Sequence, residues 1–194
     1  MYCRSLRALP PMRRQKLRIA HGGVRCHRWN DCSNLSWPVN TPMDPSHLSA
    51  DFRDFLTCLN EAGVEYLVVG GHAVAFYGYV RPTRDLDVWI AVSPENAARM
   101  VQAIRSFFGG AELTGLSPQW FLDVENVTRF GAVPNLIEIL PKISGGEFAH
   151  AFGRRMTAVV DGQKINLISF DDLIANKQAS ARLKDLADVE QLKN

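Results

Sequence analysis

Two aspartates in one short apolar stretch have the type and spacing that metal chemistry needs. Asp85 and Asp87 alternate with Leu86 and Val88, and this period of two predicts a strand with both carboxylates on one face. Their Cα atoms would then lie about 6.5–7 Å apart, a span that suits Mg²⁺ ions bridged by carboxylates and phosphates. The alternative is a solvated strand face. Because like charges side by side repel one another unless a cation lies between them, we favour the metal site.

A pair of glycines precedes the aspartates along the chain. Gly70 and Gly71 follow the apolar run 66–69 and precede a predicted short helix. Glycine lets the backbone approach a ligand closely, and the first N–H groups of a helix can bind an anion such as phosphate. Many strand–helix turns use glycine for packing alone. The glycines therefore indicate a phosphate site only together with the aspartates.

A third carboxylate lies further along the chain, inside another apolar run. Glu138 interrupts the run 136–140, and a carboxylate in a buried strand is unfavourable unless it is paired or bound to a metal. It could complete the metal site or deprotonate an attacking hydroxyl. A half-exposed strand position, or pairing with an arginine such as Arg81 or Arg129, is the alternative.

The remaining polar candidates have plainer interpretations. Arg81 and Arg84 flank the aspartates and could contact phosphate or pair with Asp85. Trp89 alternates onto the aspartate face, where packing is favoured over support for a base. Lys177 would be an exposed lysine on its helix. A charged helix face near the end of the chain is expected to be solvated, and its residues are Arg182, Lys184, Asp185 and Asp188.

Hydrophobic periodicity and turn residues predict the elements that position these side chains. Their order favours an α/β or α+β fold, and residues 112–127 give no clear assignment. Along the chain we predict a helix from Asp44-Pro45 to Gly63, a strand at 66–69, a helix at 72–79, a strand within 83–92, a helix that Ser93-Pro94 begins, a strand at 136–140, a helix at 146–155, a hairpin of 157–160 and 164–168, and helices after Ser169 and at 184–192.

Length and charge distribution indicate one folded domain and an N-terminal segment of different composition. The 194 residues have a net charge of +2, yet residues 1–42 contain eight basic residues and one acidic residue. We expect a domain at 43–194, with 1–42 as a basic disordered arm or an extension translated upstream of the true start. The spacing of Cys26 and Cys32 does not match a zinc site. With no disulfide framework, no secretory signal and no run of roughly 18 apolar residues, we expect a cytoplasmic protein without membrane contact.

The glycine pair and the aspartate pair together resemble the DNA-polymerase-beta-like nucleotidyltransferase superfamily. Its pattern is a Gly-Gly or Gly-Ser turn, a helix, and then Asp-hydrophobic-Asp/Glu-hydrophobic. The chain is more similar still to small bacterial nucleotidyltransferases related to abortive-infection toxins, over roughly residues 46–193. The matching stretches are Val68 to Ala73, Arg81 to Ile90, Pro134 to Leu140, Gly145 to Phe148, Asp172 to Lys177 and Arg182 to Asp188.

This resemblance implies a polymerase-beta-like nucleotidyltransferase fold, with a short mixed sheet flanked by helices and a C-terminal helical pair. It implies two Mg²⁺ ions, with Mn²⁺ as the alternative, and as their ligands Asp85, Asp87 and Glu138. The implied nucleotide-binding residues are Gly70, Gly71, Arg81, Thr83 and Lys177.

The reaction that the resemblance implies moves a nucleoside monophosphate from an NTP, with ATP among the candidates, to a hydroxyl of RNA, a protein or a small molecule. A tRNA or protein acceptor and a cognate antitoxin or toxin protein are the implied partners. His72 stands where the superfamily often has Ser, and Glu138 stands where Asp is commoner. These departures leave open a catalytically weak nucleotide-binding or regulatory partner with the same fold. A Rossmann-like dinucleotide-binding domain is disfavoured because the third glycine of that fingerprint is missing.

Overall fold

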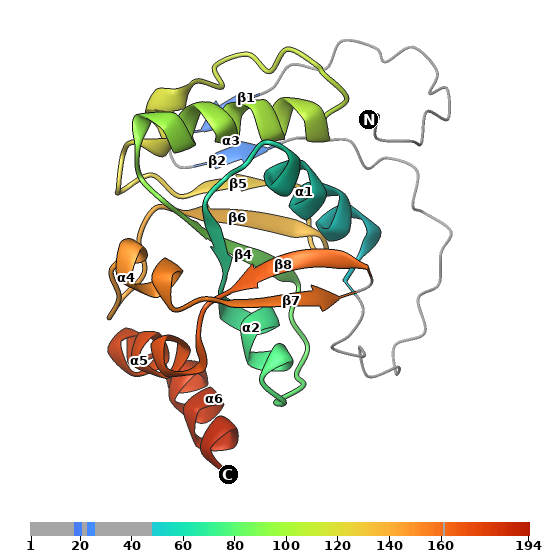
Figure 1. Ribbon diagram of the computed structural model, residues 1–194. Helices are drawn as coiled ribbons and strands as arrows, with labels where there is room; N and C mark the ends of the chain where they lie inside the picture. Colours follow the sequence, from blue (N-terminus) through green and yellow to red (C-terminus); the bar gives the residue numbers. More distant parts are fainter. Residues whose placement is uncertain (1–17, 21–22, 26–47, 161) are drawn as a thin grey trace.

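A six-stranded mixed sheet forms the centre of the structure (Figure 1), a computed structural model that describes residues 18–20, 23–25, 48–160 and 162–194. The strand order is β5-β6-β4-β3-β8-β7. The pairs β4–β6 and β3–β8 are parallel, and the pairs β3–β4, β5–β6 and β7–β8 are antiparallel. The strands are β3 (Tyr66–Val68), β4 (Asp85–Ile90), β5 (Thr128–Phe130), β6 (Leu136–Leu140), β7 (Met156–Val160) and β8 (Gln163–Leu167).

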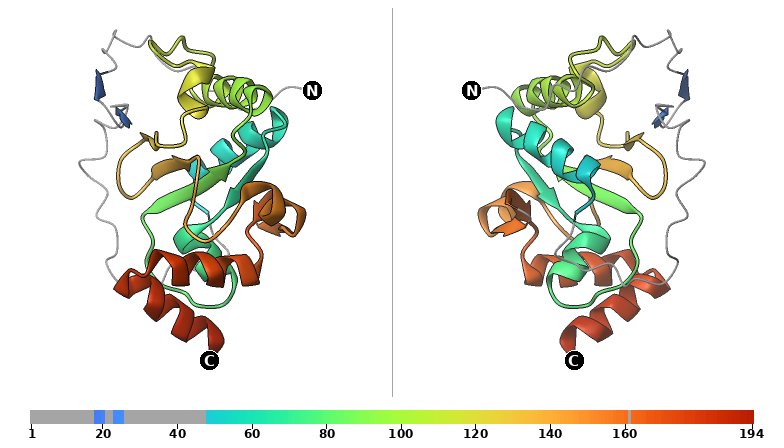
Figure 2. Two further views of the ribbon diagram at one scale, coloured as in Figure 1. Left: turned by 90° about the vertical axis from the view of Figure 1, so that its left-hand side faces the viewer. Right: turned by 90° about the vertical axis from the view of Figure 1, so that its right-hand side faces the viewer.

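Helices flank this sheet on both sides. Two of them, α1 and α3, pack together on the side of the sheet away from α2, α5 and α6 (Figures 1 and 2). The predicted α+β architecture, a short mixed sheet flanked by helices with a C-terminal helical pair, is confirmed. The helices are α1 (Ala50–Glu61), α2 (Gly70–Phe76), α3 (Pro94–Phe107), the 3₁₀ helix η1 (Pro118–Phe121), α4 (Phe148–Gly153), α5 (Phe170–Ser180) and α6 (Leu183–Lys193).

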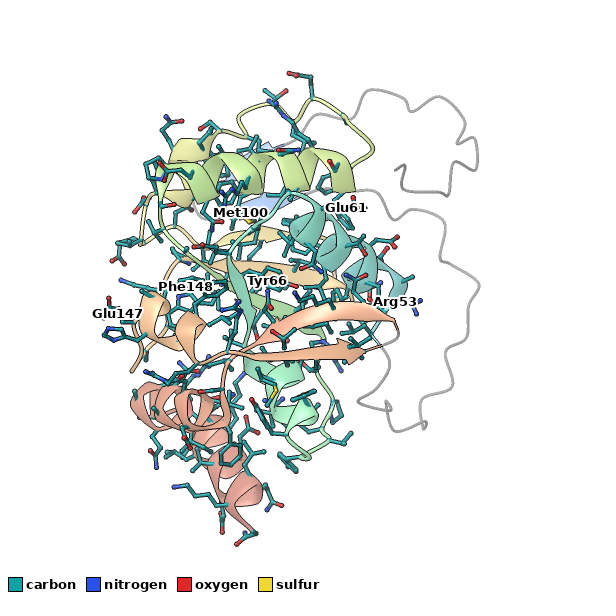
Figure 3. All side chains as sticks on the ribbon, viewed as in Figure 1. Arg53, Glu61, Tyr66, Met100, Glu147 and Phe148 are labelled. Carbon is teal, nitrogen blue, oxygen red and sulfur yellow. The ribbon has the colours of Figure 1, made fainter. Side chains whose placement is uncertain are left out.

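The central strand β4 is held on both edges and on both faces. Its apolar residues Leu86, Val88 and Ile90 are buried, as the period of two predicts. Strands β3 and β6 bond to its two edges, so the backbone groups of β4 have partners within the sheet. On the side of the sheet that α1 and α3 cover, Met100 of α3 faces the sheet and is fully buried (Figure 3). This strand is therefore a rigid support for the side chains on its remaining positions.

Local sequence signals located most of these elements but missed some boundaries. Ser93 and Ser169 cap α3 and α5 as predicted, since their hydroxyls accept hydrogen bonds from the N–H groups of Asn96 and Asp172. The first predicted helix begins later than expected. Its N-cap is Ser49, and Leu48 lies outside it, while Asp44-Pro45 falls outside the described residues. Neither β5 nor η1 was predicted.

The N-terminal segment contains two short strands that the sequence did not predict. β1 (Arg18–Ala20) and β2 (Gly23–Arg25) form an antiparallel pair, and β2 lies beside β5. The other residues of 1–42, including Cys26 and Cys32, lie outside the described part of the chain. Both interpretations of this segment therefore stay predictions. Among the described helices, none combines the length and the apolar character needed to cross a membrane.

Candidate active site

The sheet brings the three predicted carboxylates to one face. Asp85 and Asp87 alternate along β4, and β6 runs parallel to β4 with Glu138 directly opposite Asp87. Residues that are paired across neighbouring strands project to the same side of a sheet. The positions of Asp85, Asp87 and Glu138 thus follow from two local strand patterns and one strand register.

Asp87 lies in surroundings that disfavour its charged form. Burial raises the pKa of this carboxyl to about 7, and the charges of Asp85 and Glu138 raise it further, while Lys177 and Lys184 oppose the shift. A carboxylate with this environment is stabilised by any cation that binds beside it. The electrostatics of Asp87 therefore favour a bound cation.

The glycine turn lies directly against these carboxylates. Gly70 has a φ of +63°, and a Cβ atom there would lie 1.9 Å from Oδ2 of Asp87. A Cβ atom on Gly71 would lie 2.4 Å from the hydroxyl oxygen of Thr83, which donates a hydrogen bond of 3.1 Å to Oδ1 of Asp85. Both positions leave room for glycine alone. The turn after β3 and the carboxylates of β4 are therefore one site.

Glu138 has an arginine partner, as the alternative interpretation proposed. Nε of Arg129, directly across the β5–β6 pair, donates to Oε1 of Glu138 at 2.6 Å. Arg81, the other arginine considered, does not contact Glu138. The Arg129 side chain is 46% exposed, so this pair lies at the rim of the site and can exchange with solvent or ligand more easily than a buried pair.

The site fits a magnesium ion held by two carboxylates but not one held by three. Within residues 48–160 and 162–194, no group of three or more His, Cys, Asp or Glu side chains is close enough together to hold a metal ion. Mg²⁺, however, commonly binds through one or two carboxylates and keeps water and substrate phosphates as its other ligands. Asp85 and Asp87 meet that smaller requirement, and Glu138 remains an outer carboxylate held by Arg129.

Arg81 and Lys177 lie in a buried charge network, which we did not predict. Nε and Nη2 of Arg81 bind the two carboxylate oxygens of Asp188 at 2.7 and 2.8 Å. Nζ of Lys177 contacts Asp185 at 2.6 Å and Asp188 at 2.9 Å. The interpretation of Lys177 as an exposed lysine is wrong, because the side chain is only 4% exposed. Arg84, by contrast, is exposed.

The predicted solvated face of the last helix is wrong at two of its positions. Asp185 and Asp188 are 0% and 1% exposed. Their burial depends on Lys177 and on Arg81, which lies 107 residues before Asp188. The sequence signal that could have found the network is the position of Lys177 on the same face of α5 as Leu173 and Ile174, since a buried lysine needs a carboxylate partner.

Two neighbours of the site are packed side chains. Trp89 is buried and makes an edge contact of 5.2 Å between ring centroids with Phe148, on the side of α4 that faces the sheet (Figure 3). The packing interpretation of Trp89 is confirmed. His72, beside the glycine turn, meets the Phe52 ring edge-on at 5.4 Å. Burial lowers the pKa of His72 to about 4, with Asp85 opposing the shift, so the imidazole is neutral at pH 7.

Comparison with known proteins gives a structural likeness only. The sequence matches no protein-family model, and no curated protein matches it either. The structure is similar to the crystal structure of an antigenic nucleotidyltransferase-like protein from Paracoccidioides brasiliensis. The TM-score is 0.45 and the identity 19%, over 75% of this chain and 77% of that chain. A superposition this loose leaves the chemistry of the site to be judged from the residues of this chain.

Proposed function

We propose that this chain is a metal-dependent nucleotidyltransferase, which moves a nucleoside monophosphate from an NTP to an acceptor hydroxyl. The observation that carries the proposal is the contact between the glycine turn and the carboxylates. At Gly70 a Cβ atom would overlap the Asp87 carboxylate, so a phosphate chain approaching the turn also reaches the carboxylates. A turn that binds phosphates beside oxygens that bind a metal would stabilise the charge that develops in phosphoryl transfer.

The roles of the residues follow from their positions. Asp85 and Asp87 would hold Mg²⁺, with two ions in the full complex and Mn²⁺ as the alternative. When bound, the metal supplies positive charge to the triphosphate and to the departing pyrophosphate. Gly70 and Gly71 let the backbone of the turn lie directly against the side chains of Asp87 and Thr83, so phosphates bound at the turn would lie beside the metal ligands. Thr83 fixes the orientation of Asp85 through its hydrogen bond.

In this proposal Glu138 receives the proton of the acceptor hydroxyl. The acceptor hydroxyl oxygen bonds to the α-phosphorus, the bond from this phosphorus to the pyrophosphate oxygen breaks, and the hydroxyl proton passes to Glu138. The carboxylate is held by Arg129 at 2.6 Å, so a hydroxyl must replace the arginine contact or use the other carboxylate oxygen. The exposure of Arg129 permits that exchange.

The reaction can be tested on the full chain without knowing the acceptor. We would incubate the protein with Mg²⁺, each of the four NTPs and cell extract, and measure pyrophosphate release. In the double variant Asp85→Asn/Asp87→Asn, release should fall by roughly 1,000-fold, because several kcal/mol of charge stabilisation is lost. The control is Asp54→Asn, which neutralises an exposed carboxylate on α1 and should leave the rate unchanged. Persistent release in the double variant would exclude this site.

The acceptor and the cellular role are finer parts of the same proposal. The resemblance to abortive-infection nucleotidyltransferases supports a component of a toxin–antitoxin pair, with an RNA end, a protein side chain or a small molecule as acceptor. Incubation with labelled ATP, CTP, GTP and UTP against bulk tRNA and cell extract identifies which acceptor carries the label. If no NTP labels any acceptor, the transferase proposal is contradicted.

One observation favours a second candidate, a nucleotide-binding partner with little activity. The general base of the proposed reaction, Glu138, already forms a short contact with Arg129. A protein of this kind would bind an NTP with Mg²⁺ and release no pyrophosphate. Calorimetric binding measured beside the release assay separates the two candidates.

A further inference from the structure

Arg81 approaches the glycine turn with one nitrogen while its other two nitrogens are held elsewhere. Nε and Nη2 form the two bonds to Asp188. Nη1 lies 3.6 Å from the position that a Cβ atom on Gly71 would take. Among the described residues, its one hydrogen-bond acceptor is the carbonyl oxygen of Pro82, at a long 3.4 Å. Nη1 is therefore the donor of Arg81 that remains available beside the turn.

Asp188, the carboxylate that binds Arg81, is itself held in place by Lys177. Asp188 is 1% exposed and also binds Nζ of Lys177 at 2.9 Å. Lys177 is bound in turn by Asp185, which accepts further hydrogen bonds from Ser180 and Arg182, both at 2.5 Å. Because both oxygens of Asp188 have partners and the side chain is buried, the orientation of the Arg81 guanidinium follows from the packing of α5 and α6.

The network as a whole has a net positive charge. It contains three cations, Arg81, Lys177 and Arg182, and two carboxylates, Asp185 and Asp188. Although burial alone would raise it, the hydrogen bonds from Lys177, Ser180 and Arg182 lower the pKa of Asp185 to about 2. The pKa of Asp188 is lowered against burial in the same way, by its bonds from Arg81 and Lys177. Both carboxylates stay ionised, and one positive charge is left over.

We infer that Asp188 is a positioning residue, which aims Nη1 of Arg81 at an anionic phosphate oxygen held by the Gly70-Gly71 turn. The inference rests on the proposed function and deepens it, because it makes the last helix α6 a part of the nucleotide site. Two of the predicted nucleotide-binding residues then differ in role. Arg81 touches the phosphate, whereas Lys177 supports Asp188 from the other side.

The test uses magnesium tripolyphosphate, the part that all NTPs share, and calorimetric binding to the full chain. Arg81→Lys keeps the charge but removes the planar fork, so the remaining ammonium cannot bind Asp188 twice and still reach the turn. We expect binding to weaken roughly tenfold, as for the loss of one hydrogen bond to a charged group. Asp188→Asn should weaken it by a similar factor, and Asp188→Glu should restore part of the loss.

The chain offers a matched control for these variants. Arg154, at the C-cap of α4, forms a similar double contact with Asp172 on α5 and touches no residue of the site. Arg154→Lys should bind tripolyphosphate within twofold of the wild type. Melting temperatures of all variants are measured in parallel, because Asp188→Asn removes the charged partner of Arg81 and one of the two partners of Lys177 and could unfold the domain. Asp188→Glu, which keeps the charge, and Arg81→Lys then carry the test.

The outcomes separate the inference from the proposed function. Binding that weakens in Arg81→Lys and not in Arg154→Lys supports the inference, even if the wild type releases no pyrophosphate. Equal affinity in Arg81→Lys and wild type overturns it, whatever the pyrophosphate assay shows. Equal weakening in Arg154→Lys also overturns it, because the effect would then be general electrostatics. A wild type that does not bind tripolyphosphate overturns the inference as well, and the transferase proposal is still decided by pyrophosphate release.

Discussion

The carboxylates of the sheet are half-buried and those of the C-terminal helices are buried, and their charges are compensated differently. On Asp87, the charges of two further carboxylates outweigh those of Lys177 and Lys184, and together with burial they raise its pKa to about 7. Asp185 is more deeply buried, yet its pKa is lowered to about 2 because cations and a hydroxyl bind it. Burial therefore does not identify a binding site. Asp85 and Asp87, which form no ion pair within the described part of the chain, are the carboxylates that can bind a cation from solution.

The largest expected effect comes from removing the cation that Asp185 and Asp188 of the C-terminal helices share. Lys177→Met leaves Asp185 and Asp188 buried without their shared cation. Breaking a buried ion pair from one side destabilises a protein by about 3–5 kcal/mol, and we expect a loss of this size in the free energy of unfolding, measured with urea. Lys142→Met is the control, since Lys142 forms its ion pair with Glu125 at the surface and should change stability by less than about 1 kcal/mol. A small loss for Lys177→Met would contradict the comparison.

An intermediate effect is expected from removing the charge of Asp87, one of the carboxylates on the sheet. The folded-state pKa of Asp87, about 7, lies above its ordinary value of 3.8, so the native state binds this proton more tightly than the unfolded state. Its contribution to stability is complete below pH 4 and is lost as the pH rises through 7. In metal-free buffer, Asp87→Asn should therefore gain stability relative to wild type between pH 5 and pH 8, by roughly 2 kcal/mol. Mg²⁺ should remove this gain, and a difference independent of pH would contradict the assignment.

The smallest expected effect concerns the Arg129–Glu138 pair at the rim of the site. Arg129→Gln removes the partner of Glu138 from a side chain that is 46% exposed. Exposed ion pairs contribute little, so the free energy of unfolding should change by less than about 1 kcal/mol. A loss of several kcal/mol, measured by the same urea titration, would show that Glu138 belongs with the compensated carboxylates.

The two groups also differ in how far the sequence reveals them. Asp85, Asp87 and Glu138 could be placed on strands because alternation and apolar runs are local patterns, and the strand register then brought them together. The Arg81–Asp188 pair could not be predicted, since it joins residues 107 positions apart and nothing in the composition of α6 distinguishes a buried Asp from a solvated one.

The prediction of secondary structure failed where an element depends on contacts with distant residues. The strand β5 has three residues, Thr128–Phe130, too few to show a period, and it exists because β6 offers a partner. The first turn of α1 was misplaced because Asp44-Pro45 and Ser49 both carry helix-start signals, and the choice between them depends on packing. Elements that are defined by their own residues were predicted, whereas those defined by a distant partner were not.

The parallel register between β4 and β6 determines which changes in length the protein can accept. Side chains alternate along a strand, so deleting one residue inside β6 would turn an isoleucine toward Asp87 and carry Glu138 into the apolar side of the sheet. The set of carboxylates can therefore be varied one substitution at a time, but insertions and deletions within β4 or β6 would dismantle it. Variation in length belongs instead to segments such as residues 109–127, which join α3 to β5 and hold no part of the site.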